Sequence, residues 1–256
     1  MAISLRKFLL NTAVAAAVVL PAATAPAAAF DEADRKEIES IIHDYLLKNP
    51  EVLLEVQDAL TAKQVAAQRA QQQDAIASES EKIFQNPSDP VLGNPDGSAT
   101  IVEFFDYNCG FCKRAMSDMV SMMENDSELK FVLKEFPILG PDSEAAHRVA
   151  FAFYDLYPEK YAEFHLRLLG GDGRANEDTA MKVATDLGAD EAALRKQMTD
   201  PSIVERIRST YELANSLGIT GTPAYVIGDE VVSGALGEDV LTTKIANVRE
   251  CGSTTC

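Results

Sequence analysis

Two cysteines three positions apart are the residues in this chain whose type and spacing suit redox chemistry. Cys109 and Cys112 follow an apolar run, residues 101–105, that has the pattern of a buried strand. Apolar residues at helical spacing follow them, from Ala115 to Met123. A Cys-x-x-Cys pair between a strand and a helix indicates a dithiol redox motif. The alternative is half of a zinc site, but no second ligand pair follows nearby in the sequence.

The position of the two cysteines predicts different roles for them. If the helix begins near Cys109, its sulfur lies beside unpaired backbone N–H groups and the positive end of the helix dipole. Both favour the thiolate, so the pKa of Cys109 should lie below the ~8.5 of a free cysteine. Cys109 is therefore predicted to attack and Cys112, one turn deeper, to resolve. Gly110 and Phe111 lie between them, and we expect both to contact substrate; for Phe111 the alternative is a packed core residue.

Residues 1–29 have the pattern of a cleavable signal peptide. Arg6 and Lys7 precede a mostly apolar stretch, and residues 27–29 offer a small-residue cleavage site before Phe30. An uncleaved membrane anchor is the alternative, although the apolar stretch is shorter than the ~20 residues of a membrane span. Export would place the chain where disulfides form.

The charge of the chain argues against binding to nucleic acid or to anionic lipid. Cleavage after residue 29 removes two basic and no acidic residues, which takes the net charge from −17 to −19. A chain this acidic is repelled by phosphate-rich surfaces.

Residues 30–85 are predicted to form an N-terminal helical extension that serves for oligomerisation. A first helix carries an apolar stripe at Ile38, Ile41, Ile42, Tyr45 and Leu46. Asn49 is expected to cap a second helix that has Pro50 at its first position. Residues 61–78 are rich in Ala and Gln and have little apolar face, so this segment either packs back on the main domain or meets copies of itself.

The order of elements after residue 86 predicts an α/β protein. A strand, the Cys-x-x-Cys helix and a second strand at 129–136 form a β-α-β unit with a parallel pair. Residues 141–217 then show only helical patterns, with five helices expected. A hairpin and a last helix at 238–248 follow. Residues 86–256 are thus predicted to be a thioredoxin fold with an inserted helical domain at 141–217.

Several of these segments together resemble the DsbA-like thiol:disulfide oxidoreductases of the bacterial periplasm. The resemblance covers about 85–250 and lies in residues 103–105 before the dithiol, in the helical insert and in Gly221-Thr222-Pro223. It implies a cis peptide bond at Thr222-Pro223 facing the sulfurs, with the Thr222 backbone open to pair with a substrate chain. The alternative for this pair is an ordinary turn.

Within that family, residues 44–53 are similar to the ScsC branch (suppressor of copper sensitivity C). Members with such an extension can trimerise through it and act as disulfide isomerases. The oxidase DsbA has a His between its cysteines, and Gly110-Phe111 lacks one. The resemblance therefore implies a periplasmic isomerase or reductase for exported proteins, with a monomeric DsbA-like oxidase and a Cu(I)-binding or holdase protein as alternatives.

The resemblance also implies the partners of the chain. They are exported proteins with thiols or disulfides and a membrane thiol reductase of DsbD or ScsB type or a DsbB-like oxidase. Further copies of the chain, as in a trimer, are the remaining partners that it implies. No nucleic acid, cofactor or metal is implied.

Three further sets of residues carry expectations. Buried acids at the place of Glu103 accept the proton of the inner cysteine in relatives; the alternative is an acid ion-paired to Lys134. Cys251 and Cys256 are close enough in sequence for a structural disulfide, with free thiols or a second redox or metal site as alternatives. The histidines lack metal-ligand spacing and are expected at the surface or satisfied in the core: His43, His147 and His165.

Overall fold

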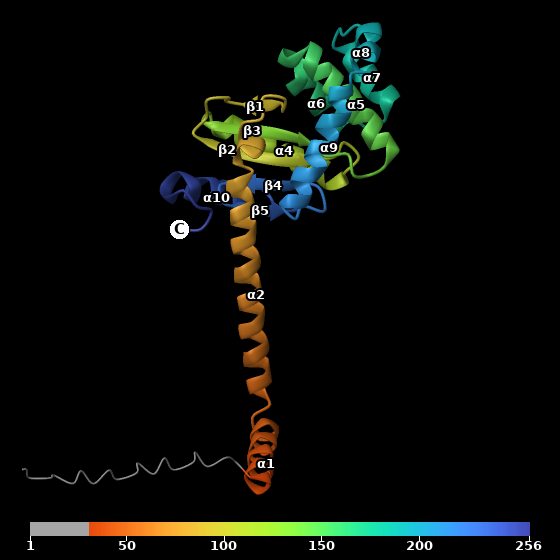
Figure 1. The fold of residues 1–256 in the computed structure, drawn as a ribbon. Helices are drawn as coiled ribbons and strands as arrows, with labels where there is room; N and C mark the ends of the chain where they lie inside the picture. Colours follow the sequence, from red (N-terminus) through yellow and green to blue (C-terminus); the bar gives the residue numbers. More distant parts are fainter. Residues whose placement is uncertain (1–30) are drawn as a thin grey trace, which may run out of the picture. The chain divides into compact units, whose positions relative to one another are not determined.

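The computed structural model of the chain describes residues 31–256 (Figure 1), so the predicted signal peptide lies outside the described residues. Contacts divide the chain into two units, one ending at Leu60 and the other running from Thr61 to Cys256. No helix in the described part is both long and apolar enough to cross a bilayer.

In the first unit, helix α1 (Glu32–Lys48) is closed at both ends by side chains. The Asp31 carboxylate accepts from the backbone N–H groups of Ala33 and Asp34, and the Asp34 carboxylate accepts from the Asp31 N–H. We expected Asn49 to cap the next helix, α2 (Glu51–Ser78). Its side chain instead donates to the Tyr45 carbonyl at 2.8 Å and so serves the end of α1.

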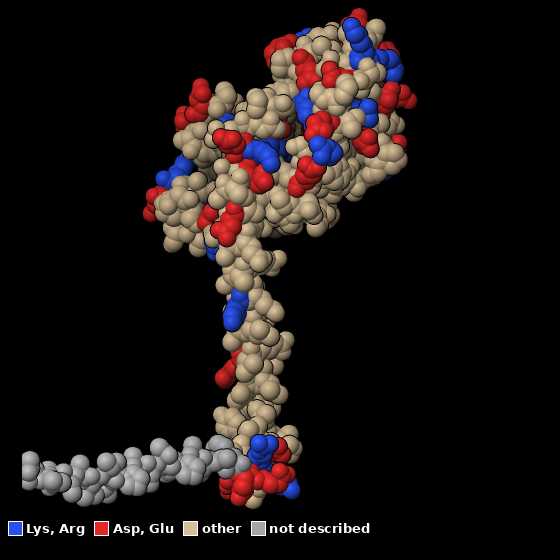
Figure 2. Space-filling model, in the orientation of Figure 1, with Lys and Arg blue, Asp and Glu red and all other residues tan. Residues whose placement is uncertain are grey.

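No residue of α1 is buried within the described chain, so its apolar stripe is uncovered. The large apolar side chains that are more than one-third exposed are Ile38, Ile41, Ile42, Tyr45 and Leu47. Most of them follow i, i+3, i+4, i+7 spacing, which places them on one face of the helix. Figure 2 shows many charged side chains on α1, whereas most of α2 is uncharged in this view.

The second unit is built on a five-stranded mixed sheet. Its strands lie in the order β1-β3-β2-β4-β5, and only β2 and β3 are parallel. The strands are β1 (Val91–Gly93), β2 (Ala99–Phe105), β3 (Leu129–Glu135), β4 (Ala224–Ile227) and β5 (Glu230–Ser233). Helix α4 (Gly110–Asn125) connects the parallel pair, which confirms the predicted β-α-β unit and the α/β class. The three-residue edge strand β1 was not predicted.

The two faces of the sheet receive alternate residues of β2. Ile101, Glu103 and Phe105 share one face, and Val102 and Phe104 share the other. Helices α4 and α10 (Glu238–Cys251) pack on the first face. The second face is covered by α9 (Pro201–Ser216), by α3 (Ser80–Phe84) and by the end of α2.

The C-terminal part of residues 61–85 belongs to the core of the second unit. Ile76 of α2 and Ile83 of α3 are buried in the cluster that covers the second face of the sheet. Of the two possibilities for this Ala- and Gln-rich stretch, packing back on the main domain therefore holds for its C-terminal part.

The helical insert follows β3 and forms the group of helices α5–α9 in Figure 1. Asn176 and Asp190 are the N-caps of two of its helices, and Pro201 is the first residue of a third. Phe153 and Phe164 stack at its centre with ring centroids 4.5 Å apart. The remaining elements are α5 (Pro141–Leu156), a 3₁₀ turn (Pro158–Lys160), α6 (Tyr161–Gly170), α7 (Glu177–Asp186) and α8 (Glu191–Gln197).

Lys134 forms a buried ion pair, but not with the acid considered from the sequence. Its ammonium group donates to the Asp89 carboxylate and to the Lys82 carbonyl. Lys134 lies opposite Phe104 in the parallel register, so it points to the second face of the sheet, whereas Glu103 points to the first. The suggested Glu103–Lys134 pair is therefore wrong. Burial lowers the pKa of Lys134 and raises that of Asp89, and the attraction between them opposes both shifts.

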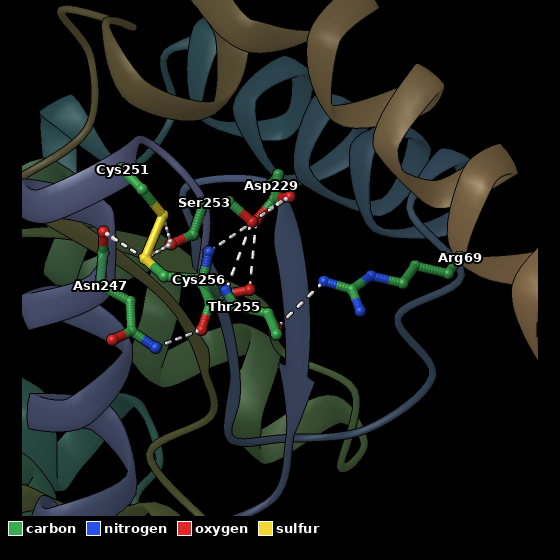
Figure 3. Close-up of a disulfide and its surroundings, with 8 residues drawn as sticks. Arg69, Asp229, Asn247, Cys251, Ser253, Thr255 and Cys256 are labelled. Carbon is green, nitrogen blue, oxygen red and sulfur yellow. Dashed lines mark hydrogen bonds between the residues drawn. A yellow bond between two sulfur atoms is a disulfide. The ribbon is translucent and has the colours of Figure 1, made fainter.

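The C-terminal tail forms a small disulfide loop. Cys251 and Cys256 are bonded, with Cα atoms 6.2 Å apart. The Asp229 carboxylate, in the β4–β5 turn, accepts from the Thr254 N–H at 3.0 Å and from the Ser253 hydroxyl at 2.9 Å (Figure 3). The loop is thus fixed at the turn of the hairpin.

Candidate active site

Cys109 is the N-cap of α4, where the sequence predicted the helix to begin. Its N–H donates to the Asp106 carbonyl at 2.9 Å, and its own carbonyl accepts from the Lys113 N–H at 3.0 Å. This position holds the sulfur over the first turn of the helix, near N–H groups that have no partner within the helix.

The environment of the pair separates the pKa values of its two thiols. A hydrogen bond from the Cys112 side chain is the largest cause that lowers the pKa of Cys109, to about 5. Contacts from the Thr222 side chain and from the backbone N–H groups of Phe111 and Cys112 add to it, although none has the geometry of a capping hydrogen bond, and partial burial opposes them. The same hydrogen bond, together with burial, raises the pKa of Cys112. Cys109 keeps 6% of its surface and Cys112 none, so the accessible sulfur is also the better thiolate.

The loop before β4 faces Cys109. The Thr222–Pro223 peptide bond is cis. The Cys109 thiol lies 3.1 Å from the Thr222 carbonyl oxygen, to which it donates, although the two residues are 113 positions apart. The Pro223 carbonyl accepts from the Gly234 N–H at 2.9 Å, so the end of β5 holds this loop in place.

Glu103 lies under the dithiol on the same face of the sheet as Cys112. Burial is the largest cause that raises its pKa, to about 8, and the negative charge of Cys109 raises it further. Tyr225, opposite Glu103 on β4, donates a hydrogen bond that lowers this pKa. Glu103 therefore changes its charge in the pH range in which thiol–disulfide exchange takes place.

An apolar groove of about 440 Å³ lies beside the sulfur. Phe111 forms one wall, and residues 220–223 and 233–236 form the other. Phe111 is 56% exposed and Leu236 52%, so the alternative of a core position for Phe111 is wrong. The Arg114 guanidinium lies 4.3 Å from the centre of the Phe111 ring and holds it at the rim of the groove. Gly110 is exposed on the same surface.

The structure thus brings together Glu103, Cys109, Gly110, Phe111, Cys112, Thr222 and Pro223. The disulfide of Cys251 and Cys256 is not part of this group, because it lies at the turn of the β4–β5 hairpin, whereas Pro223 precedes the other end.

The three histidines lie outside the dithiol site. His43 is exposed. His147 is buried and satisfied: its Nδ1 lies 2.8 Å from the Glu135 carboxylate, and its Nε2 accepts from the Tyr107 N–H. His165 is buried with no hydrogen-bond partner for either ring nitrogen, contrary to the expectation of a satisfied side chain, and burial lowers its pKa to about 3. Among residues 31–256, no three His, Cys, Asp or Glu side chains are grouped to hold a metal.

Three residues around the dithiol were missed from the sequence. The sequence does carry a signal for Tyr225. It lies two positions after Pro223 on a strand that pairs with β2, and residues paired across two strands share a face of the sheet. Asn108 and Lys113 flank the dithiol, but their partners lie about 60 residues further on. No local pattern indicates contacts of that kind.

The fold agrees with the comparisons with known proteins. Residues 100–246 match the DSBA-like thioredoxin domain, and residues 34–67 match the copper resistance protein ScsC N-terminal domain. Disulfide bond formation protein D of Bacillus subtilis is 24% identical over 56% of this chain and 69% of its own.

Two solved structures are also similar. A thioredoxin-like oxidoreductase from Silicibacter pomeroyi is 37% identical, with a TM-score of 0.64, over 67% of this chain and 98% of its own. Proteus mirabilis ScsC with a linker deletion is 28% identical, with a TM-score of 0.65, over 88% of this chain and 98% of its own. The chain therefore belongs to the DsbA-like thiol–disulfide oxidoreductase family, and it carries an N-terminal segment of the ScsC type.

Proposed function

We propose that this chain is a periplasmic disulfide isomerase and reductase for exported proteins that works as a homo-oligomer. The observation that carries the isomerase role is the uncovered apolar face of α1, in a segment that matches the ScsC N-terminal domain. A 17-residue helix that buries none of its apolar stripe gains stability when copies pack together. An oligomer would present several dithiols and apolar grooves to one misfolded client.

The chemistry begins at Cys109. Its thiolate attacks one sulfur of a client disulfide, an S–S bond forms between them, and the other client sulfur leaves as a thiolate. A second client thiolate can then attack the mixed disulfide and release Cys109, which moves the client disulfide with no net electron transfer.

Alternatively, Cys112 resolves the mixed disulfide. Its thiol must lose a proton before it attacks, and Glu103 in its ionised form is the nearby acceptor that we assign. The client then leaves as a dithiol with two more electrons, and Cys109 and Cys112 become a disulfide. A membrane thiol reductase must return two electrons before the next cycle. In the reverse direction the same steps donate a disulfide.

The groove beside Cys109 suits an extended, partly apolar client segment. Phe111 and Leu236 offer apolar surface in its lining, and Thr222 lines it too, where its backbone would pair with the client strand. This binding mode places a client disulfide against the attacking sulfur.

The test is reactivation of a scrambled-disulfide protein in glutathione buffer by the chain from Phe30 onward. A variant with Ile41→Asp and Tyr45→Asp introduces charges on the exposed stripe of α1. We expect this variant to sediment as a monomer. Its rate of client reactivation should fall by at least about tenfold, because the avidity of several linked sites is lost. A matched control, Ser40→Asp with His43→Asp, adds the same charge at exposed polar positions of α1 and should retain both properties.

A chain beginning at Thr61 provides a second comparison. Truncation near Asp89 would remove Ile76 and Ile83 from the core, so the shorter deletion separates the oligomerisation effect from a folding defect. The contrary outcome is that the wild-type chain, the variant with Ile41→Asp and Tyr45→Asp, and the chain beginning at Thr61 all fail to reactivate the client but rapidly oxidise a reduced one. In that case the isomerase proposal is wrong and a DsbA-like oxidase remains.

A further inference from the structure

The two residues that flank the dithiol both bind the same distant segment. Asn108 directly precedes Cys109, and Lys113 directly follows Cys112. Both hold the backbone of residues 171–175, which join α6 to α7 in the helical insert. The insert therefore contacts the chain both just before and just after the dithiol.

Asn108 forms a two-way hydrogen bond with one backbone unit. Its Nδ2 donates to the Ala175 carbonyl at 2.9 Å, and its Oδ1 accepts from the Ala175 N–H at 2.7 Å. The same Nδ2 also lies 2.9 Å from the Ser143 hydroxyl oxygen on the first turn of α5. A side-chain amide carries both a donor and an acceptor, so Asn108 can bind the N–H and the C=O of the same residue.

Lys113 holds the beginning of the same segment. Its ammonium group donates to the Gly171 carbonyl at 2.7 Å and to the Gly173 carbonyl at 3.3 Å. These two carbonyls and the Ala175 backbone span the whole of the 171–175 segment, so both of its ends are tied to residues that flank the dithiol.

A buried carboxylate completes the attachment. Asp106 is fully buried and accepts from the Asn108 N–H at 2.8 Å, from the Ser143 hydroxyl at 2.8 Å and from the Leu139 N–H at 2.9 Å. The Asp106 carbonyl in turn accepts from the Cys109 N–H. A continuous set of hydrogen bonds thus runs from α5 and the 171–175 segment to the backbone of Cys109.

We propose that Asn108 and Lys113 are positioning residues that tie the dithiol to the 171–175 segment of the helical insert. They fix the Cys109 sulfur where it meets Cys112 on one side and the Thr222 loop on the other. The loop before β4 supplies the Thr222 contact with the sulfur, whereas the insert holds the two residues that flank the dithiol. The inference rests on the proposed role of Cys109 as the attacking thiolate.

The test is the pH profile of Cys109 alkylation in the reduced chain from Phe30 onward, followed by mass spectrometry. Asn108→Ala removes three hydrogen bonds and changes no charge, so its effect reports position and not electrostatics. We expect the midpoint to rise by about one pH unit, which lowers the thiolate fraction near pH 5 about fivefold. The thermal unfolding midpoint is measured in parallel.

The matched control is Asn94→Ala. Asn94 also ties a turn to a distant backbone, with Nδ2 3.0 Å from the Ser127 carbonyl and Oδ1 accepting from the Asp96 N–H at 3.0 Å. Asn94 lies before β2, whereas the dithiol lies after the other end of that strand. The control should leave the alkylation midpoint unchanged even if it lowers the unfolding temperature.

Ser143→Ala is a milder variant in case Asn108→Ala does not fold. It removes one donor to Asp106 and one partner of Asn108, and it should move the midpoint in the same direction by a smaller amount. A midpoint near 5 in wild type that is unchanged in both variants overturns the positioning inference alone. An ordinary thiol midpoint in wild type overturns the proposed role of Cys109 instead.

Discussion

Replacing Cys109 by alanine should abolish thiol–disulfide exchange, with a loss of about a thousandfold or more in the exchange rate. Cys109 is the thiol whose pKa its surroundings lower, and its sulfur lies 3.1 Å from the carbonyl oxygen of Thr222, a residue that lines the apolar groove. Cys112 has no exposed surface and a raised pKa, so it cannot take over the attack. The measurement is the rate at which the reduced chain cleaves a disulfide peptide whose fluorescence rises on reduction.

Cys112→Ala should behave differently from Cys109→Ala. Attack by Cys109 continues, more slowly because the hydrogen bond that most lowers its pKa is lost. The mixed disulfide then accumulates and is visible by mass under non-reducing conditions. A double Cys251→Ser, Cys256→Ser variant is the control, because that disulfide is fixed at Asp229 and away from the groove. Retention of more than a tenth of the exchange rate in Cys109→Ala would contradict the assignment.

Replacing Glu103 by glutamine should remove a large pH dependence of stability in the reduced protein. The pKa of Glu103 is raised from 4.5 to about 8 in the fold. Between these values the unfolded chain loses a proton that the native protein keeps, so stability falls as pH rises. The stabilisation is complete below pH 4.5 and is lost as pH rises through 8, with an upper limit of about 5 kcal/mol. Glu103→Gln keeps the shape but does not titrate, so it should gain stability relative to wild type over this range.

The check on Glu103 is urea unfolding of wild type and Glu103→Gln at pH 5, 6, 7 and 8. Tyr225→Phe is the informative companion, because it removes the hydrogen bond that lowers the pKa of Glu103, so the decline should extend to higher pH and stability should fall further between pH 7 and 8. Oxidation of the dithiol removes the charge of Cys109, one of the causes that raise this pKa, so the decline should end at a lower pH in the oxidised protein. Parallel profiles for wild type and Glu103→Gln would show that Glu103 does not keep its proton in the fold.

Local patterns were sufficient to predict most of the fold. Residues close in sequence set the apolar run of β2 and the helix caps at Asn176 and Asp190. A three-residue strand such as β1 has no periodicity to detect, and it forms because β3 offers a free edge. The capping role of Asn49 was misread because Asn suits either helix end, and only its side-chain contact with Tyr45 decides between them.

The dithiol site was predictable where residues are adjacent to the cysteines and not where the contacts are distant. The start of α4 at Cys109 follows from the sequence, and with it the direction of the pKa shift. Whether Glu103 meets Lys134 depends on the register of β2 and β3, because a shift by one residue exchanges the two faces. The ties from Asn108 and Lys113 to residues 171–175 depend on how the insert folds back, which no local pattern contains.

The most direct test of Cys109 as the attacking thiolate is the pH dependence of alkylation in the reduced wild-type chain. Peptide mass mapping then assigns each adduct to Cys109 or Cys112. We expect modification of Cys109 alone, with a midpoint near pH 5, while Cys112 stays unmodified in the folded protein. Equal modification of both cysteines, with a midpoint near the ~8.5 of an ordinary thiol, would contradict the proposed mechanism.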